Sequence, residues 1–218
     1  MLPPPPLPAL RRDFPGGERL ADDPLIHVLD GVLAPAECER LIALARPLLR
    51  RAQVSGAVAG ATSPGRTSER AWLAHQVDPL VHEIAERIAA LVGLPLDHAE
   101  PLQVLRYGPG QEYRPHYDAY DLTTDKGRLY TARGGQRLVT ALVYLGDVAG
   151  GGATAFPRLG LAVTPRRGRL LLFHNCRPGT DALDPRTSHQ GLPPARGDKW
   201  AFNLWFHARA YQREARPT

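Results

Sequence analysis

The chain has 218 residues and a mass of 23.8 kDa, with 43% hydrophobic residues, 22% charged residues and a formal net charge of +5. These values are typical of one globular domain, and two cysteines are too few for a disulfide scaffold or a cysteine-based zinc cluster. Its 25 arginines and two lysines are spread along the chain without a run of five, so we expect a solvated basic surface and no nucleic-acid partner.

The proline-rich beginning of the chain, residues 1–22, predicts an extended N-terminal arm outside the core. It lacks the apolar core of a secretory signal peptide. No apolar run in the sequence approaches the roughly 20 residues that span a bilayer. We therefore expect a cytoplasmic protein without a membrane partner.

Three segments follow the arm before the middle of the chain. Apolar and β-branched residues predict a first strand over 24–33. Apolar residues at helical spacing predict a helix over 34–50, which Pro47 is expected to end or kink. Residues 52–68 are small and glycine-rich, which predicts a long loop, and long loops in compact domains tend to be functional or mobile.

The clearest helix signal covers residues 77–93. Asp78 is the expected N-cap, and Pro79 suits the first helical position. Apolar residues recur at helical spacing up to Gly93, which is expected to end the helix.

After Pro101 the chain consists of short β-rich segments separated by Gly, Pro and Asp turns. This half shows no alternation of strands and helices. Helices first and strands second predict an α+β fold with a mainly β core, in which an antiparallel barrel or sandwich carries helices on its outside. The predicted strands are LQVLRY, RLVTALVYL, ATAF, GRLLLFHN and KWAFNLWFHA.

One pair of residues has metal-ligand spacing. His116 and Asp118 are two residues apart, so on an extended segment both side chains point to the same face. Two histidines and one carboxylate on one face of an octahedron form the facial triad of non-haem Fe(II) oxygenases, and His189 is the candidate third ligand. The alternative is a plain hydrogen-bonded pair of His116 and Asp118, because so short a motif often arises by chance.

Lys199 lies ten residues after His189 at the start of a predicted apolar strand. A buried lysine needs a partner, because an unpaired buried charge is costly. A dicarboxylate co-substrate would supply that partner. The alternative is an ordinary surface amine, since lysines are seldom buried.

From about residue 24 to 207 the sequence resembles the prolyl 4-hydroxylase-type Fe(II)/2-oxoglutarate oxygenases. The resemblance implies a double-stranded β-helix (jelly roll) with supporting N-terminal helices, in a single domain over 23–210 followed by a C-terminal tail over 211–218. The matching stretches are LAPAECERLIALARP, RTS, LQVLRYGPGQEYRPHYD, GGQRLVTALVYLGDVAGGGATAFP and TSHQGLPPARGDKWAFNLWFH.

The resemblance also implies roles for individual residues. His116, Asp118 and His189 match the iron ligands of the family. Lys199 matches the residue that pairs with the distal carboxylate of 2-oxoglutarate, and two further residues match contacts to this co-substrate. These are Tyr107 and Thr154.

Three positions match the proline-binding residues of the family, namely Tyr113, Arg137 and Trp205. A planar aromatic ring can pack against a pyrrolidine ring, and an arginine can donate to a peptide carbonyl. The loop over 52–68 matches the place of a mobile substrate-covering loop, and Arg66 near its end is a further candidate for substrate binding.

The chain departs from the family pattern in two places. Residues 190–194 after the distal histidine differ from the usual small residue and cysteine, and the segment 122–135 is somewhat long. The first departure changes the rim of the substrate pocket, and together the two leave a small-molecule substrate open. His174 matches no ligand position, so we expect it to be a core histidine or one that supports the site from behind.

The resemblance therefore predicts an enzyme, a prolyl 4-hydroxylase-like dioxygenase. It would use Fe(II), 2-oxoglutarate and O2, with ascorbate as the reductant, and release succinate and CO2. The expected substrate is a proline residue in a peptide or protein. The same chemistry on a free amino acid or a natural-product intermediate is an alternative, and a non-catalytic jelly-roll binding module is a remote one. We expect a monomer or a homodimer.

Overall fold

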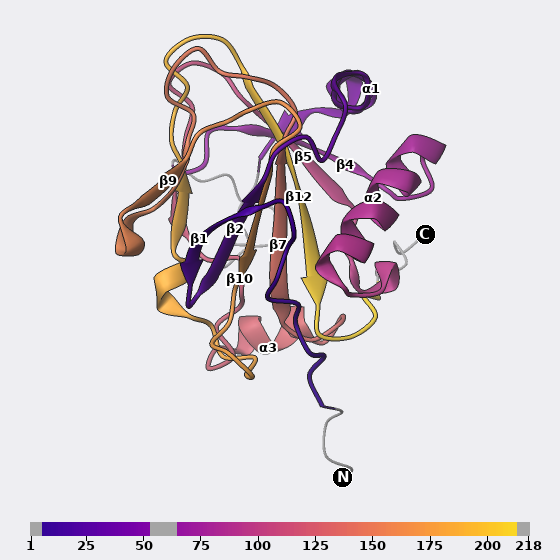
Figure 1. Ribbon diagram of the computed structural model, residues 1–218, viewed down its shortest axis with the longest axis vertical. Helices are drawn as coiled ribbons and strands as arrows, with labels where there is room; N and C mark the ends of the chain where they lie inside the picture. The colour runs from indigo at the N-terminus through magenta and orange to yellow at the C-terminus, as the bar shows by residue number, and fades with distance from the viewer. Residues whose placement is uncertain (1–5, 53–64, 213–218) are drawn as a thin grey trace.

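The computed structural model describes residues 6–52 and 65–212, which form two antiparallel β-sheets (Figure 1). The larger sheet has the strand order β1 (Glu18–Asp22), β2 (Leu25–Leu29), β10 (Leu170–His174), β7 (Arg137–Tyr144), β12 (Lys199–His207), β5 (Leu102–Tyr107), β4 (Glu69–Leu73) and β3 (Arg50–Arg51). The smaller sheet has the order β6 (Tyr113–His116), β11 (His189–Gly191), β8 (Thr154–Phe156) and β9 (Leu161–Val163).

Two helices, α1 (Pro35–Ala45) and α2 (Pro79–Val92), lie on the same side of the larger sheet, and a third, α3 (Asp125–Thr131), lies at its lower end in Figure 1. This arrangement is the predicted jelly roll with supporting N-terminal helices. Within the described ranges, no helix has the length and apolar character that crossing a bilayer would require.

Strand β12 shows why the two sides of the larger sheet differ. Its side chains alternate between two faces, as in any strand. One face of the strand is apolar throughout and packs in the same core cluster as the two N-terminal helices. The residues on this face are Trp200, Phe202, Leu204 and Phe206. The other face carries the polar residues of the site, including Lys199 and Asn203, so the sheet separates the core from the site.

Helix α2 has the predicted boundaries and caps. The Asp78 side chain accepts a hydrogen bond of 2.9 Å from the backbone N–H of Leu80, and Pro79 occupies the first helical position. Gly93 ends the helix with φ of 78°, a left-handed conformation that glycine adopts without a steric penalty.

The N-terminal arm differs from the expectation in its second half. Residues 18–22 form strand β1, which pairs with β2 at the edge of the larger sheet. The Phe14 side chain is only 2% exposed and belongs to the helix-side core. The proline content of residues 1–22 therefore does not mark the boundary of the folded body, because Phe14 packs in the core and β1 covers the edge of β2.

Two predicted boundaries also need correction, although Pro47 ends the first helix as expected. The helix predicted over 34–50 ends at Ala45, because the next residues form a 3-10 turn that contains Pro47. The strand predicted over 24–33 ends at Leu29, before the turn at Gly31. The sequence did not predict helix α3 or the strands β3, β4, β9 and β11, all of which are short.

The predicted loop and the predicted C-terminal tail are only partly described. Of the predicted loop over 52–68, residues 53–64 lie outside the described residues, and its ends are joined by a hydrogen bond of 2.8 Å from the Ala52 N–H to the Ser68 carbonyl. In the predicted tail, the Tyr211 N–H donates to the Asp97 carbonyl at 2.7 Å, and residues 213–218 lie outside the described residues.

Candidate functional site

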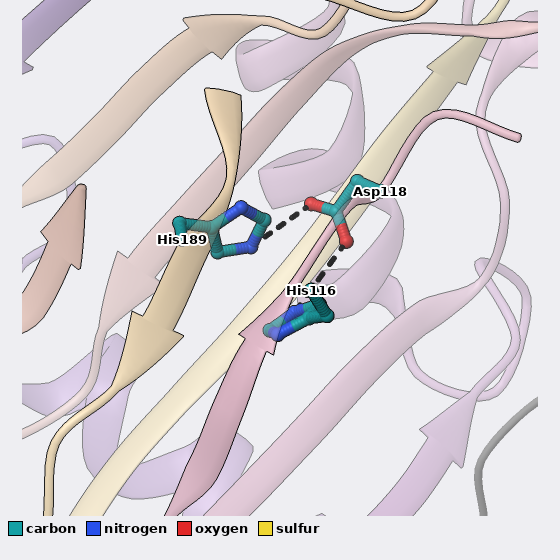
Figure 2. Close-up of side chains that lie close together, drawn as sticks. All are labelled: His116, Asp118 and His189. Carbon is teal, nitrogen blue, oxygen red and sulfur yellow. Dashed lines mark ion pairs between the residues drawn. The ribbon is translucent and has the colours of Figure 1, made fainter. Parts of the chain in front are cut away.

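Three predicted metal ligands meet between neighbouring strands of the smaller sheet (Figure 2). His116 ends β6 and His189 begins β11, and the two residues are paired across these strands. Asp118 follows two residues after His116. Its Oδ1 lies 4.0 Å from His116 Nε2, and its Oδ2 lies 3.6 Å from His189 Nε2. One nitrogen or oxygen from each of the three side chains lies within 4.8 Å of the others, so a single ion could contact all three.

The protonation of both imidazoles suits a metal. His116 Nδ1 lies 2.9 Å from the Arg114 carbonyl, and His189 Nδ1 lies 3.0 Å from the Thr187 carbonyl. A carbonyl can only accept, so Nδ1 carries the proton in each ring and Nε2 offers its lone pair to the cluster. Burial and the neighbouring His189 lower the pKa of His116 to about 3, which keeps this ring neutral at physiological pH.

The carboxylate of Asp118 is fixed from behind by two buried polar residues. The Thr140 hydroxyl donates a hydrogen bond of 2.8 Å to Asp118 Oδ2, and Asn175 Nδ2 donates one of 2.9 Å to the same hydroxyl. Burial would raise the pKa of Asp118, but the nearby imidazoles of His189 and His116 offset this effect and hold it below its usual value. The donor set of two imidazoles and one carboxylate fits a divalent iron ion.

Lys199 forms a second cluster on the site face of β12. Its side chain is 2% exposed, and its Nζ lies 5.1 Å from the ring centroid of Tyr107 and 5.6 Å from that of Tyr144. The Tyr144 hydroxyl is hydrogen-bonded to Thr154 Oγ1 at 2.8 Å. Among the described residues no carboxylate forms an ion pair with this ammonium, and burial lowers the pKa of Lys199 to about 7. A buried cation of this kind would gain from an anionic ligand.

The two clusters are neighbours. Gly191, at the end of the strand that begins with His189, faces the hydroxyl of Tyr107. Gly191 is also paired with Thr154 across β11 and β8. A molecule that contacts both the metal ligands and Lys199 would therefore lie between the two sheets along β11.

A cavity of about 650 Å³ opens beside His116 and Asp118. On its wall the guanidinium of Arg66 lies 4.4 Å from the centroid of the Tyr113 ring, and it donates a hydrogen bond of 3.0 Å to Gln103 Oε1. The Tyr113 ring is stacked on His116, with centroids 3.5 Å apart and 19° between the planes. This stack fixes the imidazole of His116, which is the most exposed of the three metal ligands.

Another part of the cavity wall contains a buried charge network. Glu100, 3% exposed, accepts hydrogen bonds from Arg137 Nε and from His207 Nε2, the latter at 2.8 Å. Burial would raise the pKa of Glu100, but Arg137 and His207 hold it below its usual value. The guanidinium of Arg137 lies over the Trp205 ring at 4.0 Å from its centroid. The network therefore presents a fixed cation and an aromatic face to the cavity.

Comparisons with known proteins agree with this geometry. The sequence profile of the 2OG-Fe(II) oxygenase superfamily matches residues 102–207. Probable prolyl 4-hydroxylase 3 of Arabidopsis thaliana is 37% identical over 216 residues, which cover 89% of this chain and 73% of that protein. The chain belongs to the prolyl 4-hydroxylase family of 2OG-Fe(II) oxygenases.

Two further members of the prolyl 4-hydroxylase family support the assignment. Prolyl 4-hydroxylase subunit alpha-1 of Mus musculus is 39% identical over 194 residues, which cover 88% of this chain but only 36% of that subunit. The crystal structure of the viral collagen prolyl hydroxylase from Paramecium Bursaria Chlorella virus-1, in complex with 2OG, has a TM-score of 0.66 and 30% sequence identity and covers 84% of this chain and 94% of that one. Family membership makes this protein a dioxygenase that depends on Fe(II) and 2-oxoglutarate.

The predicted residues fall into two groups. Those that line the cavity are Arg66, Tyr113, His116, Asp118, Arg137 and Trp205. His189 completes the metal-ligand cluster without lining the cavity. Lys199, Tyr107 and Thr154 lie together in the second cluster. His174 is buried and lines a separate cavity that the arm residues Leu7 and Leu10 also line, so it belongs to neither group.

The sequence alone did not single out four residues of the site. Thr140 and Tyr144 are four residues apart on the predicted strand RLVTALVYL, and they are the polar residues on its site face. That alternation was a usable signal. Glu100 and Asn175 lie just outside strands, where no periodicity marks them, and only the three-dimensional contacts identify them.

Proposed function

We propose that this protein hydroxylates proline residues in a peptide or protein substrate, using Fe(II), 2-oxoglutarate and O2. The observation that carries the proposal is the position of the ligand cluster. His116 and Asp118 line the same cavity as the cation and aromatic face of Arg137 and Trp205. A substrate held on that face has its C–H bonds next to the metal site.

In this proposal His116, Asp118 and His189 hold the ferrous ion. When bound, the iron and 2-oxoglutarate supply the oxidising chemistry, in which decarboxylation to succinate and CO2 accompanies transfer of one oxygen atom of O2 to the substrate carbon. The protein keeps the two imidazoles in the Nε2-binding tautomer and orients the carboxylate through Thr140. Ascorbate would keep the iron ferrous between turnovers.

The cluster around Lys199 suits the distal carboxylate of 2-oxoglutarate. Lys199 supplies a buried ammonium, and a charge-assisted hydrogen bond is strongest where water is excluded. Tyr107 and Thr154 place two hydroxyls in the same cluster. Gly191 beside Tyr107 and His189 are only two residues apart on β11. The opposite end of 2-oxoglutarate would therefore reach the metal.

Proline recognition is supported by three wall residues. Trp205 offers an aromatic ring against which a pyrrolidine ring can pack. The Tyr113 ring is stacked on His116 with the Arg66 guanidinium over it, and it lines the same cavity. Arg137 keeps donors available to a peptide carbonyl, because only its Nε is taken up by Glu100 in the contacts described above. The relatives named as prolyl 4-hydroxylases, and the viral enzyme named as a collagen prolyl hydroxylase, support the same substrate class.

A mass-spectrometric turnover screen tests the proposal. The purified protein is incubated with Fe(II), ascorbate, 2-oxoglutarate and O2, with proline-rich peptides and free proline in parallel reactions. The expected result is a gain of one oxygen on a peptidyl proline that requires 2-oxoglutarate, lost in Asp118→Ala and kept in the matched surface variant His82→Ala. His82 lies on the exposed side of α2.

Three other results would overturn the proposal in different ways. Oxygen gain on free proline alone would assign the enzyme to a small-molecule substrate. Succinate formation that continues unchanged in Asp118→Ala would remove the metal assignment. Peptide binding without any 2-oxoglutarate turnover would indicate a binding module.

A further inference from the structure

Trp205 is the centre of a longer row of ring and cation contacts that crosses the cavity wall. On one side its ring lies 6.2 Å from that of Trp72 on β4, and the guanidinium of Arg70 lies 5.9 Å from the Trp72 ring. On the other side the guanidinium of Arg137 lies 4.0 Å from the Trp205 ring. Each of these four residues lines the cavity.

The row continues from Arg137 into helix α3. The Arg137 guanidinium lies 4.9 Å from the ring of Tyr120, which is stacked on Tyr130 with centroids 5.3 Å apart and 12° between the planes. The ammonium of Lys126, one helical turn before Tyr130, lies 5.9 Å from the Tyr130 ring. We call these seven contiguous side chains, from Arg70 on β4 to Lys126 on α3, the aromatic–cation ladder.

The cavity around the ladder has an excess of positive charge. Its lining contains five Lys or Arg side chains and three Asp or Glu side chains. Of the three acids, Glu100 is paired with Arg137 and Asp118 belongs to the metal-ligand cluster. Asp121 is the remaining acid, and it accepts hydrogen bonds from Thr123 in its own turn. Residues 53–64, which the structure does not describe, contain no charged residue in the sequence.

The cavity lining also contains a buried side-chain oxygen that accepts no hydrogen bond from the described residues. Asn203 Oδ1 is buried without a hydrogen-bond partner among the described residues, and the side chain is 8% exposed. Asn203 lies two residues before Trp205 on the same face of β12 and lines the cavity. A buried polar atom without a partner is costly, so this oxygen suits an N–H group that a ligand brings.

From these observations we propose that the ladder binds an extended, acidic, proline-containing peptide, whose target proline lies at Trp205 and whose carboxylates reach Arg70 at one end and Lys126 at the other. Aromatic-lined grooves bind extended proline-rich segments, since that conformation is already ordered before binding. The cations at the ends add selectivity for acidic flanks. This inference rests on the proposed proline hydroxylation and names the class of peptide that undergoes it.

A peptide panel tests the inference with the full-length protein, Fe(II), ascorbate and 2-oxoglutarate. All peptides share one central proline and its immediate neighbours, and they carry glutamate, serine or lysine at positions three to five residues away on the N-terminal side, the C-terminal side or both. Hydroxylation is followed by mass spectrometry. For each flank that carries glutamate next to a cation of the ladder, we expect a KM about fivefold lower than that of the serine peptide. This factor is the upper range for an exposed charge pair. The difference in KM should shrink at high salt, which screens such pairs.

Charge reversal then assigns each flank to one end of the ladder. Lys126→Glu should remove or reverse the preference for glutamate on one flank, and Arg70→Glu should do so on the other flank. Arg128→Glu is the matched control on α3, because Arg128 does not line the cavity. This variant should prefer glutamate flanks as strongly as the wild type does. Trp72→Ala should raise KM for all peptides by a similar factor, whatever their flanks.

The outcomes separate this inference from the proposed function. Equal KM values for glutamate, serine and lysine peptides, with hydroxylation of all three, would overturn the ladder proposal and leave proline hydroxylation intact. A glutamate preference that survives in both Lys126→Glu and Arg70→Glu would also overturn it. Absence of hydroxylation on every peptide, with turnover of free proline, would overturn the proposed function itself.

Discussion

The hydroxyl of Thr140 donates a hydrogen bond of 2.8 Å to Oδ2 of Asp118, while its own oxygen accepts one of 2.9 Å from Asn175. Thr140 and Asn175 are fully buried. Because the hydroxyl has one proton, acceptance from Asn175 directs that proton to the carboxylate. The strand β7 thus fixes the orientation of a ligand that belongs to the segment after β6.

Replacement of Thr140 by valine should weaken iron binding about 10- to 100-fold, the usual effect of removing a partner that orients a metal ligand. Valine keeps the shape of the side chain but leaves Asn175 without its acceptor. A titration of the metal-free protein with Fe(II) under anaerobic conditions measures the affinity. Thr140→Ser keeps the hydroxyl and should restore most of it, whereas equally weak binding in the serine variant would show that packing, not the hydrogen bond, is responsible.

Lys199 should couple 2-oxoglutarate binding to pH. Burial lowers its pKa to about 7, so above this pH the ammonium of the empty protein loses its proton, although Tyr107 and Tyr144 face it. A bound carboxylate favours the charged form, so binding above pH 7 must take up a proton and the affinity should fall up to tenfold per pH unit. Calorimetry in buffers of different ionisation enthalpy measures both quantities, and Lys199→Met should bind weakly with no such slope.

The same group predicts the pH dependence of folding for the protein without co-substrate. Between about pH 7 and its ordinary pKa of 10.5, the unfolded chain holds a proton on Lys199 that the folded chain has released. Unfolding therefore takes up a proton, and the free energy of unfolding contributed by this residue rises with pH across that window. Denaturant titrations of wild type and Lys199→Met should differ by a slope of this sign, and a difference that falls with pH would contradict the assignment.

Glu100 should contribute strongly to stability. Glu100→Ala leaves the Arg137 guanidinium buried without its partner, which costs about 3–5 kcal/mol for a buried pair. The pKa of Glu100 is depressed by Arg137 and His207, so its contribution is present above its ordinary pKa of 4.5 and is lost as the pH falls through the depressed value. The matched control is Glu69→Gln, whose partner Arg106 is about one-third exposed, and it should cost less than about 1 kcal/mol in chemical denaturation.

The elements that could be predicted from the sequence are those with a strong local pattern of caps or apolar residues. Helix α2 has a cap, a proline and a terminal glycine in the expected places, and β5 covers the residues of the predicted strand LQVLRY. Long apolar runs and strong caps specify such elements locally. Strand β1 has no such pattern, because ERLAD contains no β-branched residue and forms a strand only by pairing with β2.

In the candidate site too, some residues could be predicted from local patterns and others could not. The spacing of His116 and Asp118 and the isolation of Lys199 in an apolar strand are visible along the chain. The contact of Thr140 with Asp118 joins residues 22 positions apart, and that of Glu100 with His207 joins residues 107 apart. The first contact follows from the packing of the two sheets against each other and the second from the order of the strands in the larger sheet, and no local pattern specifies either.

A substitution in α3 tests whether the position of this helix affects the binding of the peptide substrate. Gly127 is part of α3, and a Cβ built at this position would overlap the carbonyl oxygen of Asp121. Gly127→Ala must therefore displace the helix that carries Lys126 and Tyr130, at a cost of about 1–3 kcal/mol in stability. Gly146→Ala is the matched control, because a Cβ there meets no atom within 4 Å.

We expect Gly127→Ala to raise the KM for acidic proline peptides severalfold, while the affinities for Fe(II) and 2-oxoglutarate stay at the wild-type values. His116 and His189 belong to β6 and β11 and Lys199 belongs to β12, so we expect a displacement of α3 to leave these three residues in place. Steady-state kinetics and direct binding measurements on both variants check this. A Gly127→Ala protein with a lowered melting temperature but an unchanged peptide KM would show that α3 supports the fold without positioning the substrate.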